Sequence, residues 1–413
     1  MKQLRWLAAV GLLLSLPLTG SSLRSADWPQ WRGPNRDGLS AETGLLKAWP
    51  KSGPKLLWKA TGLGVGYSSI AIAKGKIFTM GDQKDASYLL ALDLSGKELW
   101  KTKLGKTGGN YAGTRSTPTV DGDLVFGLGQ FGDLLCVEAA SGKERWRKNL
   151  DSDFGGKVGG WNYAESVLID GQRLVCAPGG KAGTVLALDK SSGNVLWQSK
   201  EYTDHSEYTS MVAAEICGVR QYVHLSHKTL AGLAPDTGRV LWQIPRRGET
   251  AVIPTPIVSG DDVYVTSGYG VGCNLFHVSK SADAFKAEEV YAVKDMMNHH
   301  GGVVKVGEHL YGHSDSKGWI CQELKSGKTV WREKNNLGKG SITYADGLLY
   351  LRAEDGKGTV VLIEATPEGW KEHGRFDQPF RSKENSWAHP VVAGGRLYLR
   401  DMDVLLAYEV ASP

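Results

Sequence analysis

Eight side chains able to bind a ligand or move a proton stand at one recurring position, six to eight residues before a repeated glycine. Guanidinium and ammonium groups can engage anions, indole offers a stacking face, and carboxylate and imidazole groups can orient hydroxyls or transfer protons. The alternative is that polar groups at this position only hydrate a channel. The set consists of Arg115, Tyr163, Glu165, His299, His300, Lys339, Trp387 and His389.

Together these side chains could surround one small anionic or polyhydroxylated ligand, so all eight are candidate cofactor-binding or ligand-binding residues. If a reaction occurs there, the candidate catalytic groups are Glu165, His300 and His389, since carboxylate and imidazole groups can exchange protons with a substrate. Three further polar residues lie close enough in sequence to contribute: Asn162, Tyr208 and Asn298.

The sequence gives little support for a metal centre or for common hydrolase sites. Adjacent His299 and His300 would project to opposite faces of a strand and could not readily share an ion. The acids of Asp121-Gly-Asp123 and Asp401-Met-Asp403 adjoin expected turns and strand edges, where solvated carboxylates are common. We therefore assign no metal ligands. The chain also contains no Gly-x-Ser-x-Gly elbow, no phosphate-binding loop and no HExxH sequence.

A repeat indicates the elements that must position these side chains. A glycine is followed within two to four residues by an aliphatic residue and usually an aromatic one, and successive copies are 40 to 49 residues apart. This period is typical of a four-stranded propeller blade. Glycine between alternating apolar residues favours a tight β-hairpin because it tolerates φ > 0. Eight hairpins are predicted, at Gly75, Gly122, Gly171, Gly218, Gly260, Gly307, Gly347 and Gly395.

A second repeat follows these hairpins: a small residue, an acid two positions later, glycine at position six and tryptophan at position ten. Full copies end at Trp146, Trp197 and Trp331, and altered copies end at Trp100 and Trp242. The equivalents near Tyr291 and Trp370 are degenerate, which predicts less regular fifth and seventh blades. Because the tryptophan recurs in most blades, we expect it to pack between neighbouring blades and not to bind a ligand.

These Ala-x-Asp-x-x-x-Gly-x-x-x-Trp copies resemble the tryptophan-docking repeats of the pyrroloquinoline-quinone-type β-propellers, over roughly residues 54–410. The resemblance implies an all-β, eight-bladed β-propeller of four-stranded antiparallel blades. That family includes quinoprotein alcohol dehydrogenases and a non-enzymatic bacterial outer-membrane assembly factor, so the resemblance implies a fold more firmly than a reaction. The opening segment Trp28–Gly38 resembles that of short exported propellers described only as quinone-binding-like.

Resemblance to the dehydrogenases implies pyrroloquinoline quinone with calcium, an aspartate base and, in many members, a disulfide between adjacent cysteines. No adjacent pair occurs here, and no acid matches that base, although Glu165 is the best carboxylate candidate. We therefore favour a ligand-binding or protein-scaffold propeller with a polar site in its central channel. A quinone-dependent alcohol or polyol dehydrogenase is the alternative. Cys136 and Cys321 sit in apolar strand-like stretches and are expected to be small buried hydrophobes. No disulfide framework is expected, with one bridge left open, for the five cysteines Cys136, Cys176, Cys217, Cys273 and Cys321.

The last repeat ends near Tyr408 without the outer strand that its predecessors have. The segment Lys55–Trp58 resembles this missing strand, and docking it against the last blade would close the ring and cover a sheet edge. Residues 54–413 are thus expected to form a single propeller domain. Residues 27–53 are expected to form an N-terminal strap packed against it, the alternative being an exposed contact surface of aromatic and basic side chains.

Residues 1–26 have the pattern of a signal peptide, in which basic residues precede an apolar run that is too short to span a bilayer. Cleavage near Ala26 removes Lys2, Arg5 and Arg24 and no acid, so the formal charge falls from +5 to +2. We expect export to the periplasm, cell envelope or medium, with no transmembrane anchor after cleavage. A nearly neutral chain argues against nucleic acid and leaves a small polar or anionic ligand, or an envelope protein, as the partner.

Overall fold

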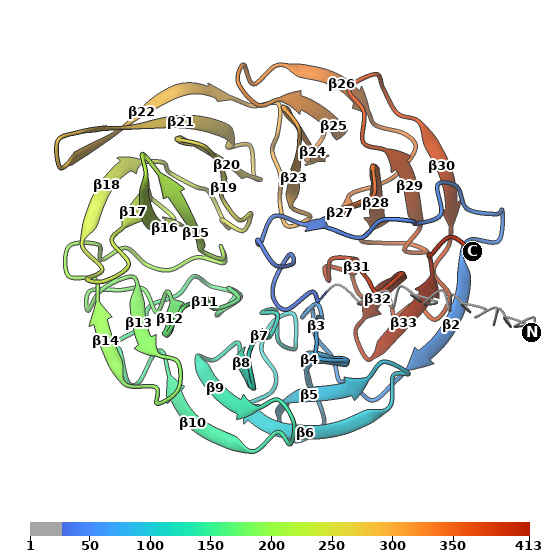
Figure 1. Ribbon diagram of the computed structural model, residues 1–413, viewed down its shortest axis with the longest axis horizontal. Coiled ribbons are helices and arrows are strands. Elements are labelled where there is room, and N and C mark those ends of the chain that lie inside the picture. The colour runs from blue at the N-terminus through green and yellow to red at the C-terminus, as the bar shows by residue number, and fades with distance from the viewer. Residues whose placement is uncertain (1–26) are drawn as a thin grey trace, which may run out of the picture.

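A computed structural model describes residues 27–413, which form a ring of eight β-sheets around a central channel (Figure 1). Within each blade neighbouring strands are antiparallel and follow chain order from the channel outward, except where the N-terminal segment contributes a strand. The predicted all-β, eight-bladed propeller is confirmed. The expected leader, residues 1–26, lies outside the described residues.

Blades one to four each use four consecutive strands. The first contains β3 (Ala71–Ala73), β4 (Lys76–Asp82), β5 (Ser87–Asp93) and β6 (Glu98–Gly105). The second contains β7 (Thr119–Asp121), β8 (Leu124–Leu128), β9 (Asp133–Glu138) and β10 (Glu144–Asn149). The third contains β11 (Leu168–Asp170), β12 (Arg173–Cys176), β13 (Leu186–Asp189) and β14 (Val195–Gln198). The fourth contains β15 (Val212–Ile216), β16 (Val219–Leu225), β17 (Thr229–Leu233) and β18 (Val240–Pro245).

Blades five to eight complete the ring. The fifth contains β19 (Ile257–Ser259), β20 (Asp262–Ser267), β21 (Gly272–Ser281) and β22 (Ala284–Val293). The sixth contains β23 (Val303–Val306), β24 (His309–Ser314), β25 (Gly318–Glu323) and β26 (Thr329–Glu333). The seventh contains β1 (Leu39–Ser40), β27 (Gly340–Ala345), β28 (Leu348–Ala353), β29 (Val360–Glu364) and β30 (Glu372–Phe376). The eighth contains β31 (Val391–Ala393), β32 (Arg396–Asp401), β33 (Val404–Glu409) and β2 (Lys55–Ala60).

The ring closes where β2 pairs antiparallel with β33, with Trp58 opposite Ala407. This confirms that an N-terminal strand supplies the missing outer strand of the last blade. All eight predicted glycines lie in the turn between the first and second strands of their blades, with φ between 57° and 85°. At these turns glycine avoids the steric cost that an L side chain would pay.

The recurring tryptophans join neighbouring blades. Trp146 of β10 donates its indole N–H to the carbonyl of Lys190 in the next blade at 2.9 Å. A Cβ at Gly193 of that blade would lie 2.8 Å from the Trp146 ring, so only glycine lets the indole pack so closely. In the fifth blade Tyr291 replaces tryptophan and donates its hydroxyl to Leu324 at 2.8 Å. The repeat is therefore an inter-blade contact, as predicted.

The seventh blade lacks its own docking tryptophan. Gly374 of β30 pairs with Leu362, the register at which Trp331 pairs with Cys321 in the sixth blade. Trp49 of the N-terminal segment occupies this place: its amide donates to His373 at 2.9 Å, and a Cβ at Gly374 would lie 2.7 Å from the Trp49 Cβ. A tryptophan distant in sequence thus completes the irregular blade.

The rest of the N-terminal segment, residues 27–53, enters the channel and then crosses the ring beside β27 (Figure 1). Trp28 forms an antiparallel bridge with Ile72 of β3. The guanidinium of Arg36 donates to the carbonyls of Ser166 and Val167 before β11, that of Arg32 donates to the carbonyl of Val303 on β23, and both side chains are about 95% buried or more. These basic side chains therefore hold the channel walls together and do not form an exposed contact surface.

Candidate functional site

A cavity of about 180 Å³ opens at the centre of the ring, and we call it the channel cavity. Most of its wall comes from the segments that lead into the inner strands of seven blades, so the propeller brings residues up to 320 positions apart to one point. Two wall residues come from elsewhere, Trp31 from the N-terminal segment and Tyr269 from the turn between β20 and β21. The lining is Trp31, Tyr67, Tyr111, Arg115, Trp161, Ala164, Tyr208, Ser210, Ala251, Ile253, Tyr269, His299, His300 and Trp387.

Trp31 closes the channel cavity on the side of the N-terminal segment. Its indole N–H donates to the Thr255 hydroxyl at 3.0 Å, and its ring centre lies 4.6 Å from that of His389. His389 itself is buried behind Trp31 and donates Nε2–H to the carbonyl of His300 at 2.9 Å. Burial lowers the pKa of His389 to about 3, with the nearby Arg32 guanidinium acting in the same direction. His389 is thus a neutral support of the wall.

Four of the eight sequence-predicted residues line the channel cavity: Arg115, His299, His300 and Trp387. Arg115 is held by the wall, since its guanidinium donates to the carbonyls of Asn110 and Tyr111 at 2.7 and 2.8 Å and to the side-chain oxygen of Gln130 at 2.9 Å. Those bonds fix the loop before β7. They leave the Arg115 guanidinium few free N–H groups to donate to an anionic ligand.

His299 links Lys339 to Tyr269. The Lys339 ammonium donates to His299 Nδ1 at 2.6 Å and pairs with Asp315 at 3.0 Å, while His299 Nε2 lies 2.8 Å from the Tyr269 hydroxyl. Burial, together with the charges of His300 and Lys339, lowers the pKa of His299 to about 3. With Nδ1 accepting from Lys339, the ring proton of neutral His299 sits on Nε2 and is donated to Tyr269. Lys339 therefore lies outside the lining of the channel cavity and contacts it through His299.

His300 is held by Glu354, whose carboxylate lies 2.6 Å from His300 Nε2 and accepts from the indole N–H of Trp387 at 3.1 Å. Burial alone would raise the pKa of Glu354, but the hydrogen bond and charge of His300 and the charge of Lys339 lower it overall. The rings of His299 and His300 lie 4.6 Å apart. The expectation that they face opposite ways is wrong, because both precede β23 and stand in a turn instead of a strand.

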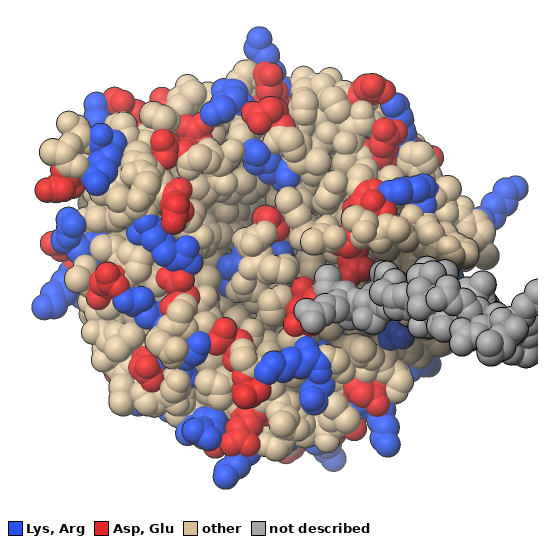
Figure 2. Space-filling view, in the orientation of Figure 1, with Lys and Arg blue, Asp and Glu red and all other residues tan. Residues whose placement is uncertain are grey.

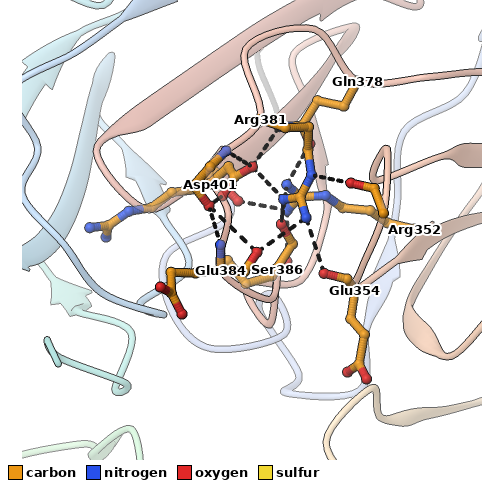
Figure 3. A network of polar contacts seen from close by, with 11 residues as sticks. Arg352, Glu354, Gln378, Arg381, Glu384, Ser386 and Asp401 are labelled. Atoms are coloured by element: carbon orange, nitrogen blue, oxygen red, sulfur yellow. Dashed lines mark hydrogen bonds and ion pairs between the residues drawn. The ribbon is translucent and has the colours of Figure 1, made fainter. Parts of the chain in front are cut away.

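Trp387 and Glu354 are positioned by a buried polar network between blades seven and eight (Figure 3). Arg381 pairs with the fully buried carboxylate of Asp401, and Arg352 donates to the Ser386 hydroxyl at 3.0 Å. The Ser386 amide in turn donates to the backbone carbonyl of Glu354 at 2.6 Å. In Figure 3 the Glu354 carboxylate points away from this cluster, which leaves it for His300 and Trp387.

Tyr163 and Glu165 do not line the channel cavity, although Ala164 between them does. Side chains of an extended segment alternate in direction, so the neighbours of an inward-facing residue enter the wall. The Tyr163 hydroxyl donates to the carbonyl of Pro178 at 3.0 Å within a hydrophobic cluster. Glu165 is 1% exposed, and one of its oxygens accepts from the Ala177 amide. Burial raises the pKa of Glu165 to about 8.

The sequence interpretation missed most of the aromatic wall. Tyr111, Trp161 and Tyr269 each follow or separate glycines in loops, in Gly-Gly-Asn-Tyr, Gly-Gly-Trp and Gly-Tyr-Gly. A search for aromatic residues within glycine-rich loops could have found them. Tyr208, named as a neighbour, lines the channel cavity, whereas Asn298 holds the turn at His299 by bonding Gly302 and His313.

A calcium-bound quinone does not fit the residues of this wall. Among residues 27–413, no carboxylate or carboxamide side chain lines the channel cavity, and calcium prefers oxygen ligands of those kinds. Across residues 27–413, no group of three or more histidine, cysteine, aspartate and glutamate side chains is placed to hold a metal ion. All five cysteines are free.

Surface charge is mixed: on the face seen in Figure 2, Lys and Arg alternate with Asp and Glu and form no broad patch of one sign. This face lacks the basic stripe typical of nucleic-acid binding. In the part of the chain that the structure describes, no helix has the length and apolarity needed to cross a bilayer.

Curated relatives are outer membrane protein assembly factors named BamB. The protein from Burkholderia pseudomallei is 26% identical over 230 residues, covering 52% of this chain and 55% of the relative. That from Shewanella oneidensis is 25% identical over 264 residues, covering 57% and 60%. The matched part of the chain thus spans a little more than half the length of these relatives.

Solved structures share the fold at low identity. BamB from Moraxella catarrhalis has a TM-score of 0.60 at 16% identity, covering 86% of this chain and 97% of that one. A quinohemoprotein alcohol dehydrogenase from Comamonas testosteroni has a TM-score of 0.65 at 12% identity, covering 94% and 81%. A family model described as outer membrane protein assembly factor BamB matches residues 85–333. The chain therefore belongs to this family of pyrroloquinoline-quinone-like repeat propellers.

Proposed function

We propose that this chain is a non-catalytic binding propeller of the cell envelope and that it contacts its ligand or envelope partner through the channel cavity. The observation that carries the proposal is an aromatic wall at which the charged groups are engaged internally: Arg115 in the lining by its own loop, and Glu354 behind the lining by His300 and Trp387. A wall of this kind binds by packing and a few hydrogen bonds. Membership of a family described as an outer membrane assembly factor supports an envelope role.

The proposal includes the domain plan and compartment expected from the sequence. Residues 1–26 would direct export and be removed, residues 27–53 would form the strap, and residues 54–413 would form the propeller. The mature protein would act in the periplasm or at the envelope. Support comes from the strap's buried contacts across the channel and from relatives whose names place them in outer membrane protein assembly.

A quinone-dependent alcohol or polyol dehydrogenase is the second candidate, favoured by the shared fold with quinohemoprotein alcohol dehydrogenases. It would need calcium ligands and a base beside the quinone. Of the three candidate catalytic groups, His300 alone lines the channel cavity, while Glu165 and His389 are buried outside it. The residues present therefore favour binding without turnover.

Two measurements test the proposal. Site-specific photo-crosslinking in cells compares position 111 with position 195, because Tyr111 at the channel cavity and Val195 on β14 are similarly exposed, at 51% and 53%. We expect an adduct with an envelope component at position 111 and none at position 195. Equal adducts, or none at position 111, would refute the assigned surface.

The second measurement follows dye reduction by the purified protein with added pyrroloquinoline quinone, calcium and a panel of alcohols and sugars. We expect no substrate-dependent reduction above that of the cofactor mixture alone. Saturable turnover that is lost in Glu165→Gln or His300→Gln would replace the binding proposal with the dehydrogenase.

A further inference from the structure

Two aromatic side chains in the wall of the channel cavity are exposed although they stand at the centre of the ring. Tyr111 and Tyr269 are 51% and 42% exposed, and both stand on left-handed backbone with φ of 55°. Non-glycine residues pay a steric cost in that region, and such strain persists where surrounding structure enforces it. We propose that the channel cavity binds a neutral sugar ring, an assignment of ligand class that rests on the proposed binding function.

Stacking surfaces stand on several sides of the channel cavity. Trp387 stacks on Tyr67 with ring centres 4.4 Å apart, and Tyr111 lies 5.3 Å from Trp387. Across the wall, Trp161 and Tyr208 meet edge to face at 6.0 Å. The C–H faces of a pyranose are apolar while its rim carries hydroxyls, so aromatic faces bury the former and leave the latter for hydrogen bonds.

Two polar groups of the wall have hydrogen-bonding capacity left for such a rim. Tyr269 accepts the proton of His299 Nε2, which leaves its own O–H to donate to a ligand. The side chain of His300 is about nine-tenths buried, and its Nδ1 has no hydrogen-bond partner while Nε2 is held by Glu354. An unpaired buried nitrogen is costly, and a ligand hydroxyl would satisfy it. A sugar hydroxyl can accept from the Tyr269 O–H, and it can pair with His300 Nδ1 in either protonation state because hydroxyls both accept and donate.

The charged groups around the channel cavity disfavour the other ligand classes that aromatic walls commonly bind. A quaternary ammonium would meet no carboxylate in the lining and would lie near Arg115 and Lys339. An anion would find Arg115 already donating to Asn110, Tyr111 and Gln130. A neutral polyhydroxylated ring avoids both penalties. It could be a free sugar or the end of an envelope glycan, since the recognising chemistry is the same.

Titration calorimetry with the purified protein tests this assignment. The probes are methyl glycosides of glucose, galactose, mannose and N-acetylglucosamine, with tetramethylammonium and pyrroloquinoline quinone as comparators. We expect saturable binding of at least one glycoside. Tyr269→Phe and His300→Gln should each weaken it about 2- to 10-fold, the effect of losing one hydrogen bond. The control Tyr88→Phe removes a hydroxyl that bonds Asp85 on the surface and should change nothing.

A matched pair tests stacking. Tyr111→Ala should abolish measurable binding, whereas Phe380→Ala should leave it unchanged, because Phe380 has the same 51% exposure and a φ of 58° but lies outside the lining. Thermal melts of both variants show whether the fold is kept. Co-sedimentation of the protein with isolated envelope glycan, compared with its competition by free glycoside, distinguishes an envelope glycan from a free sugar as the source of the ligand.

Three outcomes overturn the assignment: no glycoside binds, tetramethylammonium or the quinone binds more tightly than every glycoside, or Tyr269→Phe and Tyr111→Ala bind like the parent protein. If crosslinking at position 111 still yields an envelope adduct, the binding function stands and only the sugar is wrong. If neither crosslinking nor glycoside binding is found, both the binding function and the sugar assignment are refuted.

Discussion

Replacing Trp49 with alanine should destabilise the propeller by about 3–5 kcal/mol, the usual cost of removing a buried tryptophan. Trp49 is 7% exposed and fills the place in the seventh blade where Gly374 stands instead of a docking tryptophan. Its ring lies 5.8 Å from Tyr350 and 5.4 Å from Phe376, in a cluster that also includes Tyr408 of the eighth blade. Its loss would therefore open a cavity between two blades.

The indole N–H of Trp49 has no hydrogen-bond partner in the described part of the chain, so the expected cost is one of packing. With an unfolding entropy of about 2.1 cal/mol/K per residue over residues 27–413, the expected loss corresponds to a melting temperature about 4–6 °C lower. Differential scanning calorimetry measures both quantities. The control is Trp370→Ala, since Trp370 is half-buried and packs beside Trp331 at the edge of its cluster.

We expect the control to lower the melting temperature by less than half as much. Equal shifts for the two variants would refute the idea that Trp49 replaces the docking residue of the seventh blade. An unchanged melting temperature for Trp49→Ala would mean that the strap contributes nothing to the stability of the ring.

Three further predictions concern the ring and its buried charges. A chain that starts after Trp58 lacks most of β2 and exposes the edge of β33, so it should elute as aggregates in size-exclusion chromatography. A truncated chain that stays monomeric and keeps the melting temperature of the parent protein would contradict closure of the ring by β2. Because burial raises the pKa of Glu165 to about 8 from 4.5, the folded state keeps a proton that the unfolded state loses. Its stabilising effect is complete below about pH 4.5 and lost as pH rises through 8, so the free energy of unfolding should fall over that range and Glu165→Gln should flatten the fall. Arg381→Ala leaves the buried Asp401 carboxylate without its cation and should cost about 3–5 kcal/mol in urea unfolding. By contrast, Arg375→Ala at an exposed pair should cost under about 1 kcal/mol, and similar losses would show that the buried pair is not special.

The parts of the fold that depend on local sequence could be predicted. Each hairpin glycine sits where the backbone needs positive φ, a requirement that the neighbouring residues impose. The tryptophan repeat likewise encodes its contact, because the glycine that meets each docking tryptophan belongs to the next copy of the same repeat. Even the closing strand was predicted, at Lys55–Trp58, since the last repeat lacked an outer strand; the observed strand extends to Ala60. The repeat period thus determined the number of blades, the strands within them and the strand that closes the ring.

The channel cavity depends on contacts that no local pattern contains. The offset from the hairpin glycine predicted which segments reach the channel, but it did not predict which side chains point inward. Ala164 lines the channel cavity, while the side chains of Tyr163 and Glu165 point away from it into the protein. A shift of one residue reverses side-chain direction in an extended chain, and the sequence does not mark that shift. Likewise, Trp31 could not be assigned to the wall before the path of the N-terminal segment was known.

The sequence by itself therefore determined a closed eight-bladed ring, because turn geometry and inter-blade packing are local and repeated. Only the tertiary structure decided which side chains meet at its centre and which partners its charged groups have. Glu354 illustrates the reason: nothing around it repeats, yet it holds His300 from 54 positions away and Trp387 from 33. Such pairings arise where non-repeating segments from different blades converge, and their chemistry is set by distance in space.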